Sequence, residues 1–127
     1  MKYILIVDDT RPLAESIADI LQMEGYEVQI AANGMHALNT MASRVPDIVI
    51  TDLLMPEMDG LSLIRKIRSS EKYSSIPVIV LTADASEESA RMGKEAGADL
   101  LLTKPFDDTY LVEWIQRFLA DEQDRTH

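Results

Sequence analysis

Five short apolar segments recur along the chain, and each is followed by a stretch with the spacing of an amphipathic helix. They begin near residues 4, 28, 48, 78 and 100. The segment 3–7 is almost wholly apolar, which is typical of a strand covered on both faces. Residues 27–31 alternate between apolar and polar, so we expect that strand at an edge of the sheet. Five such units predict an α/β fold: a doubly wound parallel sheet with helices on both faces.

The totals agree with one globular domain. The chain has 127 residues, of which 46% are hydrophobic and 27% charged, enough for a single core and unlike a disordered segment. We expect residues 1–120 to form the domain and residues 121–127 to be a polar C-terminal tail that frays. The apolar runs are too short to span a bilayer, and no signal peptide is visible. We therefore expect a cytoplasmic protein that does not bind membranes.

Charge limits the partners. The net charge is −10, from 22 acidic and 12 basic residues. A chain this acidic repels a phosphate backbone, so we expect no direct binding to nucleic acid. There is no cysteine, which excludes disulfides, thiolate metal sites and cysteine nucleophiles.

Helical spacing predicts which residues face the core. Thr10 is expected to cap the first helix, and Asp107 the last. Residues 86–96 form the weakest predicted helix, because Met92 is its one large apolar residue and Gly93 costs roughly 1 kcal/mol relative to alanine. The inward positions of the other helices include Leu13, Ile17, Ile20, Leu21 and Met23; Met35, Leu38 and Met41; and Leu111, Trp114, Ile115, Phe118 and Leu119.

Reactive side chains follow four of the predicted strands. Asp8-Asp9, Asp52, Thr82 and Lys104 all stand at carboxyl ends, where open parallel sheets bind their ligands. Crowded carboxylates repel one another by about 4 kcal/mol per pair at ~4 Å and an effective dielectric constant of 20. A cation relieves that repulsion, and carboxylate oxygens favour a hard divalent ion such as Mg²⁺.

These residue types suit phosphoryl transfer. A carboxylate such as Asp52 can accept a phosphoryl group and form an aspartyl phosphate. The charge that develops on the phosphoryl oxygens can be stabilised by a metal, by the Lys104 ammonium, and by the Thr82 hydroxyl or a backbone N–H. The sequence therefore predicts a metal-assisted phosphoacceptor site.

In combination the motifs resemble a known family. They are Val7-Asp8-Asp9, Asp52 followed by Met55-Pro56 and Asp59-Gly60, Leu81-Thr82-Ala83, Ala96-Gly97-Ala98-Asp99 and Lys104-Pro105-Phe106. Together with the separations of 30 residues from Asp52 to Thr82 and 22 from Thr82 to Lys104, they resemble the receiver domain of two-component response regulators. The resemblance spans roughly residues 2–119 and is closest to single-domain receivers of the chemotaxis-regulator type.

The resemblance implies a role for each matching residue. Asp52 would take a phosphoryl group from the phosphohistidine of a sensor histidine kinase or histidine phosphotransfer protein. Asp8, Asp9 and Asp52, with the backbone carbonyl of Leu54, would ligate Mg²⁺ (or Mn²⁺), and Thr82 and Lys104 would contact the phosphoryl oxygens. It also implies a cis peptide bond before Pro105 and the flavodoxin-like strand order 2-1-3-4-5. Output would be contact with an unknown downstream protein.

Three positions depart from the pattern or tune it. Leu101 stands where the family often has an aromatic switch residue, so we expect the weak helix 86–96 to be the moving part instead. Leu54, two residues after Asp52, is apolar where polar residues are frequent, and we expect it to shield an acyl phosphate from water. Asp84, two residues after Thr82, could instead orient water.

Other functions remain open at this stage. A haloacid-dehalogenase-like phosphatase would need Asp-x-Asp after the first strand, whereas this chain has adjacent Asp8-Asp9. A flavodoxin-like cofactor carrier would need a Ser/Thr/Gly-rich phosphate loop there. A degenerate receiver that serves as a constitutive binding module is a third alternative. A segment cut from a longer regulator or a hybrid kinase would carry the same motifs.

Overall fold

The computed structural model of the chain describes residues 1–53 and 59–125, with side chains described up to residue 120. Strands and helices alternate along this part of the chain. In order they are β1 (Tyr3–Val7), α1 (Arg11–Met23), β2 (Glu27–Ala31), α2 (Gly34–Ser43), β3 (Ile48–Thr51), α3 (Gly60–Ser69), β4 (Val78–Thr82), α4 (Glu87–Ala96), β5 (Leu100–Thr103) and α5 (Asp108–Arg125). The backbone of α5 continues into the segment 121–127 that we expected to be a tail.

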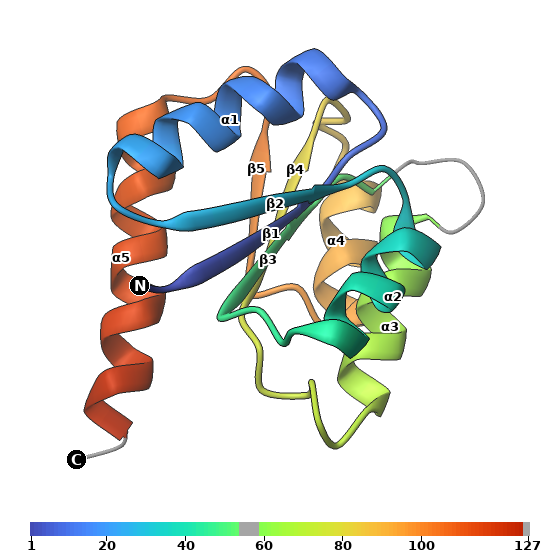
Figure 1. Ribbon diagram of the computed structural model, residues 1–127. Helices are drawn as coiled ribbons and strands as arrows, with labels where there is room; N and C mark the ends of the chain where they lie inside the picture. Colours follow the sequence, from blue (N-terminus) through green and yellow to red (C-terminus); the bar gives the residue numbers. More distant parts are fainter. Residues whose placement is uncertain (54–58, 126–127) are drawn as a thin grey trace.

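The strands form one parallel sheet of order β2-β1-β3-β4-β5. This confirms the expected strand order and the edge position of β2. Helices α1 and α5 cover one face of the sheet, and α2, α3 and α4 cover the other (Figure 1). The arrangement is the doubly wound, flavodoxin-like fold, which brings the carboxyl ends of the strands to one edge.

Alternation along each strand builds two cores, one on either side of the sheet. Ile4, Ile6, Ile48, Ile50, Ile79 and Leu81 pack with α1 and α5. Leu5, Val7, Val49, Val78 and Val80 pack with α2, α3 and α4. Since β1, β3 and β4 are buried along their whole length, near-continuous apolar runs are what their environment requires.

Most helix ends match their sequence signals. The side chains of Asn33, Asp59 and Ser86 accept hydrogen bonds from N–H groups in the first turns of α2, α3 and α4. The Asp107 carboxylate accepts the Thr109 N–H at the start of α5, at 2.8 Å. The prediction that the Thr10 hydroxyl caps α1 is wrong, because the Thr10 side chain makes no capping hydrogen bond. Its backbone N–H instead donates to Asp8.

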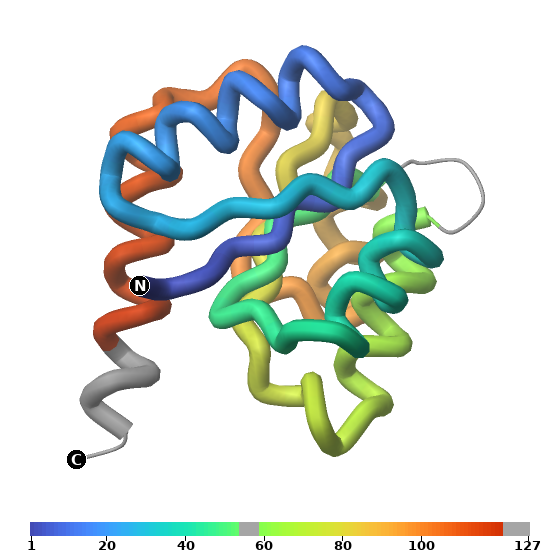
Figure 2. The backbone as a smooth tube through the Cα atoms, viewed as in Figure 1, coloured from blue at the N-terminus to red at the C-terminus, as the bar shows by residue number. Residues whose placement is uncertain are grey.

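The predictions that Met23 and Met35 face the core are also wrong, and the prediction that Trp114 faces the core is only partly confirmed. Met23 is 88% exposed and Met35 47% exposed. Met23 is the last residue of α1, and Met35 is the second residue of α2, so each lies at an end of its apolar stripe. Trp114 is half-buried and packs edge-on against Tyr110. The backbone path of the sheet and its covering helices can be followed in Figure 2.

None of the helices in residues 1–53 and 59–125 is both long enough and apolar enough to cross a membrane.

Candidate functional site

The strand register brings the predicted site residues together at one edge of the sheet. Val7 of β1 is the register partner of Thr51 in β3, and Asp8 and Asp52 follow them directly. The ladder continues past the strand end, because the Asp52 N–H donates to the Val7 carbonyl at 3.2 Å. The Lys104 N–H likewise donates to the Thr82 carbonyl at 2.7 Å. Backbone hydrogen bonds therefore position both Asp52 and Lys104.

One ammonium lies between two carboxylates. The Lys104 Nζ is 3.3 Å from Asp52 Oδ2 and 3.5 Å from Asp8 Oδ2. The three side chains are 17%, 16% and 5% exposed, respectively, so water screens this cluster only in part. Each member comes from a different strand end, at positions separated by more than 40 residues in sequence. The structure thus forms a compact cluster of two acids and one base.

Asp8 and Asp9 are adjacent but differ in environment. Asp8 is buried, and its Oδ1 accepts the Thr10 N–H at 2.8 Å while its Oδ2 faces Lys104. Asp9 is exposed, and within the described residues its carboxylate makes no hydrogen bond or ion pair. Asp9 therefore follows the cluster residue Asp8 in sequence and has an exposed carboxylate.

The backbone of Asp52 is held by the start of α3. Its Oδ1 accepts the Leu53 N–H at 2.6 Å, and the Gly60 N–H donates to the Leu53 carbonyl at 2.8 Å. A Cβ atom on Gly60 would lie 2.0 Å from the Asp52 carbonyl oxygen, closer than two non-bonded atoms can approach. Gly60 is a site residue that the sequence alone did not identify, although the Asp59-Gly60 pair marked the start of a helix.

Thr82 is the last residue of β4, and Asp84 follows it in the loop that leads to α4. Thr82 is buried, and its hydroxyl oxygen accepts the Asp84 N–H at 3.1 Å. The Asp84 carboxylate accepts hydrogen bonds from the Ser89 hydroxyl and the Ser86 N–H. These bonds, chiefly that from Ser89, lower the pKa of Asp84. In this structure the Asp84 carboxylate is hydrogen-bonded to the first turn of α4.

Of the two leucines predicted to tune the site, the structure describes Leu101 but not Leu54. Leu54, with its carbonyl, and Met55-Pro56 lie outside the described residues. Leu101 is half-buried, and its Cδ1 lies 3.2 Å from the position of a Cβ on Gly93 in α4. Leu101 therefore packs against α4 at Gly93. The Lys104–Pro105 peptide bond is cis, as the resemblance implied.

The donor atoms of the cluster fit a hard divalent cation. Within the described residues, no group of three or more His, Asp or Glu side chains is arranged to hold a metal ion. Magnesium, however, often takes only one or two carboxylates and keeps several waters. Asp8 Oδ2 and Asp52 Oδ2 both face the Lys104 ammonium, so two carboxylates already point into one small volume.

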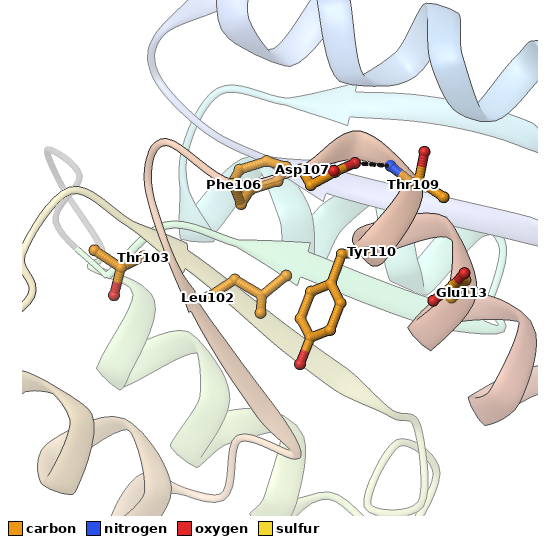
Figure 3. A pocket seen from close by; sticks show the side chains of 7 residues that line it. All are labelled: Leu102, Thr103, Phe106, Asp107, Thr109, Tyr110 and Glu113. Atoms are coloured by element: carbon orange, nitrogen blue, oxygen red, sulfur yellow. Dashed lines mark hydrogen bonds between the residues drawn. The ribbon is translucent and has the colours of Figure 1, made fainter.

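A hollow at the start of α5 lies apart from this cluster. About 470 Å³ of space is bounded by β5 and the first turns of α5, with Leu102, Tyr110 and Glu113 among its walls (Figure 3). None of Asp8, Asp52 and Lys104 lines it. An ion and a phosphoryl group need little volume, so we assign the site from its chemistry and not from the size of the hollow.

A comparison with known protein families agrees with this geometry. The family model described as the response regulator receiver domain matches residues 4–116. The chain belongs to this family. Its receiver fold therefore accounts for nearly all of the sequence.

Known proteins resemble this receiver domain in sequence and structure. The phosphate regulon transcriptional regulatory protein PhoB of Pseudomonas aeruginosa is 40% identical over 93% of this chain and 52% of its own length. The signal receiver domain of a signal transduction histidine kinase from Syntrophus aciditrophicus is 36% identical, with a TM-score of 0.90 over 95% of this chain and 92% of its own. The chemotaxis protein CheY4 of Vibrio cholerae is 35% identical, with a TM-score of 0.87 over 94% and 99%. The receiver domain spans about half the length of the curated relatives it matches.

Proposed function

We propose that Asp52 accepts a phosphoryl group from the phosphohistidine of a histidine kinase or histidine phosphotransfer protein, with the help of Mg²⁺ or Mn²⁺. The observation that carries this proposal is the Lys104 ammonium, which lies within 3.5 Å of both Asp52 and Asp8 at the carboxyl edge of the sheet. Family membership supports it, since a receiver domain is the phosphoacceptor class that the motifs resemble.

The proposed reaction uses the groups of the cluster in distinct roles. A carboxylate oxygen of Asp52 attacks phosphorus and forms an O–P bond, while the P–N bond breaks and its electron pair stays on the imidazole nitrogen of the donor. Lys104 then faces a phosphoryl oxygen and offsets the charge that spreads over the transferring group. When bound by Asp8, Asp9 and Asp52, the divalent cation supplies further positive charge for those oxygens.

Thr82 is proposed to donate a hydrogen bond to the phosphoryl group. Its hydroxyl oxygen already accepts the Asp84 N–H, so its own proton is directed away from that nitrogen. The hydroxyl proton is then available for a phosphoryl oxygen above the strand end. In this role Thr82 also connects the phosphorylated state to the β4–α4 segment, because Asp84 and α4 follow it directly.

A small phosphodonor tests the proposal without the kinase. The chain is incubated with phosphoramidate or acetyl phosphate and Mg²⁺, and its intact mass is measured. We expect one phosphoryl group, which does not form when EDTA removes Mg²⁺ before the donor is added and which is absent in Asp52→Asn, with circular dichroism showing that the variant folds. A label on a residue other than Asp52 would overturn the assignment. No label on a folded wild-type chain would favour a constitutive binding module, and turnover of phosphate esters would favour a phosphatase.

The signalling role follows as part of the same proposal. Phosphorylation would change contacts with a downstream protein, in the cytoplasm where a kinase can reach the site. The PhoB relative is named a transcriptional regulatory protein. Because the net charge of −10 disfavours contact with a phosphate backbone, we propose output of this domain through protein contact and not through direct binding of nucleic acid.

A further inference from the structure

A buried hydroxyl stands directly before the proposed phosphoacceptor. Thr51 is the last residue of β3 and is only 1% exposed. Its register partners are Val7 in β1 and Val80 in β4, and both valines belong to the core on the side of α2, α3 and α4. Because register partners in a sheet point to the same face, the Thr51 side chain points toward this apolar core. A hydroxyl in such a place costs free energy unless it forms a hydrogen bond.

The Thr51 hydroxyl forms that hydrogen bond with the next residue. Its Oγ1 donates to the carbonyl oxygen of Asp52 at 2.9 Å. This carbonyl belongs to the peptide unit that joins Asp52 to Leu53, and the N–H of the same unit donates to Asp52 Oδ1 at 2.6 Å. Since a peptide unit is planar, its two ends turn together. One rigid unit therefore connects the Thr51 hydroxyl to the Asp52 carboxylate.

The start of α3 packs against the same peptide unit. The Gly60 N–H donates to the Leu53 carbonyl at 2.8 Å, and a Cβ on Gly60 would lie 2.0 Å from the Asp52 carbonyl oxygen. Close packing limits where this oxygen can lie. A hydrogen-bond donor also fixes the direction in which the C=O bond points, because hydrogen bonds weaken steeply away from their preferred angles. The Thr51 hydroxyl supplies such a donor from β3.

We propose that Thr51 is a positioning residue for the phosphorylation of Asp52. Its hydroxyl orients the peptide unit and polarises it, so that the Leu53 N–H becomes a stronger donor and holds Asp52 Oδ1 in place. Asp52 Oδ2 then stays directed toward the Lys104 ammonium, 3.3 Å away. The hydroxyl acts through the backbone and need not contact the phosphoryl group; it keeps the carboxylate in the geometry from which attack occurs. The inference rests on the proposed function, because it assigns a further residue to the same site.

Thr51→Val and Thr51→Ser separate the hydroxyl from the shape of the side chain. Valine keeps the shape and removes the donor, whereas serine keeps the donor. The full chain and each variant are labelled with phosphoramidate at saturating Mg²⁺, and intact mass gives the rate over a range of donor concentrations. In Thr51→Val we expect the maximal rate to fall about three- to tenfold, with the half-saturating donor concentration unchanged. In Thr51→Ser the maximal rate should stay within about twofold of the wild type.

Thr40→Val is the matched control. The Thr40 hydroxyl also donates to a backbone carbonyl at 2.9 Å, that of His36 in α2. The control therefore removes the same kind of hydrogen bond from a residue that does not adjoin Asp52 in sequence. We expect its labelling rate to stay within about twofold of the wild type. Equal slowing in Thr40→Val and Thr51→Val would overturn the proposal.

The amide proton of Leu53 reports the state of this peptide unit without any phosphoryl donor. A short hydrogen bond moves an amide proton resonance to high frequency. We expect the Leu53 resonance to move to lower frequency in Thr51→Val and to return in Thr51→Ser, while the rest of the amide spectrum stays dispersed. A change that only altered packing would not be reversed by serine, which is smaller than both valine and threonine.

The outcomes distinguish this inference from the proposed function. If the wild type is labelled on Asp52 and folded Thr51→Val is labelled equally fast, the role of Thr51 is overturned and the proposed function stands. An unmoved Leu53 resonance in Thr51→Val also overturns the role of Thr51 alone. If the wild type is not labelled on Asp52, the proposed function falls and this inference falls with it.

Discussion

Lys104 holds together two carboxylates that would otherwise repel each other. Its Nζ is 3.3 Å from Asp52 and 3.5 Å from Asp8. In Lys104→Met without metal, the two acids lose their counter-charge, and we expect a loss of about 1–3 kcal/mol in the free energy of unfolding after allowance for partial exposure. Urea unfolding in EDTA measures this loss.

The same substitution is expected to strengthen Mg²⁺ binding, because the ammonium no longer competes for the carboxylates. We expect Mg²⁺ to stabilise Lys104→Met more than the wild type, while labelling by phosphoramidate becomes slower because Lys104 no longer faces the phosphoryl oxygens. Lys94→Met, at an exposed position on α4, serves as the control. If Mg²⁺ stabilised Lys104→Met less than wild type, Lys104 would not be a competitor of the ion.

Gly60 tests how strictly the backbone of Asp52 is positioned. A Cβ there would lie 2.0 Å from the Asp52 carbonyl oxygen, so α3 or β3 must move in Gly60→Ala. We expect a loss of about 1–3 kcal/mol in the free energy of unfolding and slower phosphorylation of Asp52. Urea unfolding and the rate of labelling measure these effects.

Gly93→Ala is the matched control. A Cβ on Gly93 would meet the Leu101 Cδ1 at 3.2 Å, which is the end of a side chain that can shift. Alanine also favours a helix by roughly 1 kcal/mol over glycine, so we expect little net change in stability. Equal losses in both variants would show that the close contact at Asp52 is not what matters.

At the scale of elements, the start of α4 is stabilised by the carboxylate of Asp84. Asp84 accepts the Ser89 hydroxyl and the Ser86 N–H, and these bonds lower its pKa. A lowered pKa in the folded state means that the ionised carboxylate stabilises α4 above the ordinary aspartate pKa. That contribution is lost as the pH falls through the lowered value.

Titration by NMR checks this assignment. We expect the Asp84 carboxyl to titrate below the ordinary aspartate range and the amides of α4 to begin to shift over the same interval. In Ser89→Ala the main cause is removed, so the pKa of Asp84 should rise toward its ordinary value. An unchanged pKa in that variant would contradict the role of Ser89.

Helix α4 also has less apolar anchoring than α5. Its buried residues are Gly93 and Ala96, whereas α5 buries Leu111, Val112, Ile115 and Leu119. We expect amides of α4 to exchange with solvent on the order of tenfold or more faster than those in the first half of α5. Hydrogen exchange followed by NMR measures both helices in one sample. Similar protection in the two helices would remove α4 as the candidate moving part.

At the scale of the whole molecule, the topology was predictable because burial imposes a pattern that the sequence carries directly. Apolar runs separated by amphipathic helices predict a parallel sheet, and the alternating residues 27–31 lie at its edge as expected. Helical spacing did not give the limits of each buried stripe, so Met23 and Met35 were misplaced. Where a stripe ends depends on how far the sheet extends beneath the helix, which is a property of the assembled fold.

The candidate site was predictable to the same extent. Parallel strands bring their carboxyl ends to one edge, so Asp8, Asp52 and Lys104 lie together as expected. The close approach of Gly60 was not predictable, because it depends on the angle at which α3 meets β3. The hydrogen bonds from Ser86 and Ser89 to Asp84 were not predictable either. An aspartate near a site and an aspartate that caps a helix look alike in sequence.

The net charge of the molecule predicts how NaCl and Mg²⁺ change its free energy of unfolding. A net charge of −10 destabilises the compact state through self-repulsion, which salt screens. We expect NaCl to raise the free energy of unfolding modestly. Mg²⁺ at the same ionic strength should add a further increment of about 2.7 kcal/mol at one hundred times its Kd.

In Asp8→Asn the NaCl effect should persist, whereas most of the Mg²⁺ increment should vanish, because that carboxylate faces the same small volume as Asp52. Urea unfolding with MgCl₂ and NaCl at matched ionic strength separates the two effects. An equal gain from both salts in the wild type would show that the acid cluster holds no specific cation.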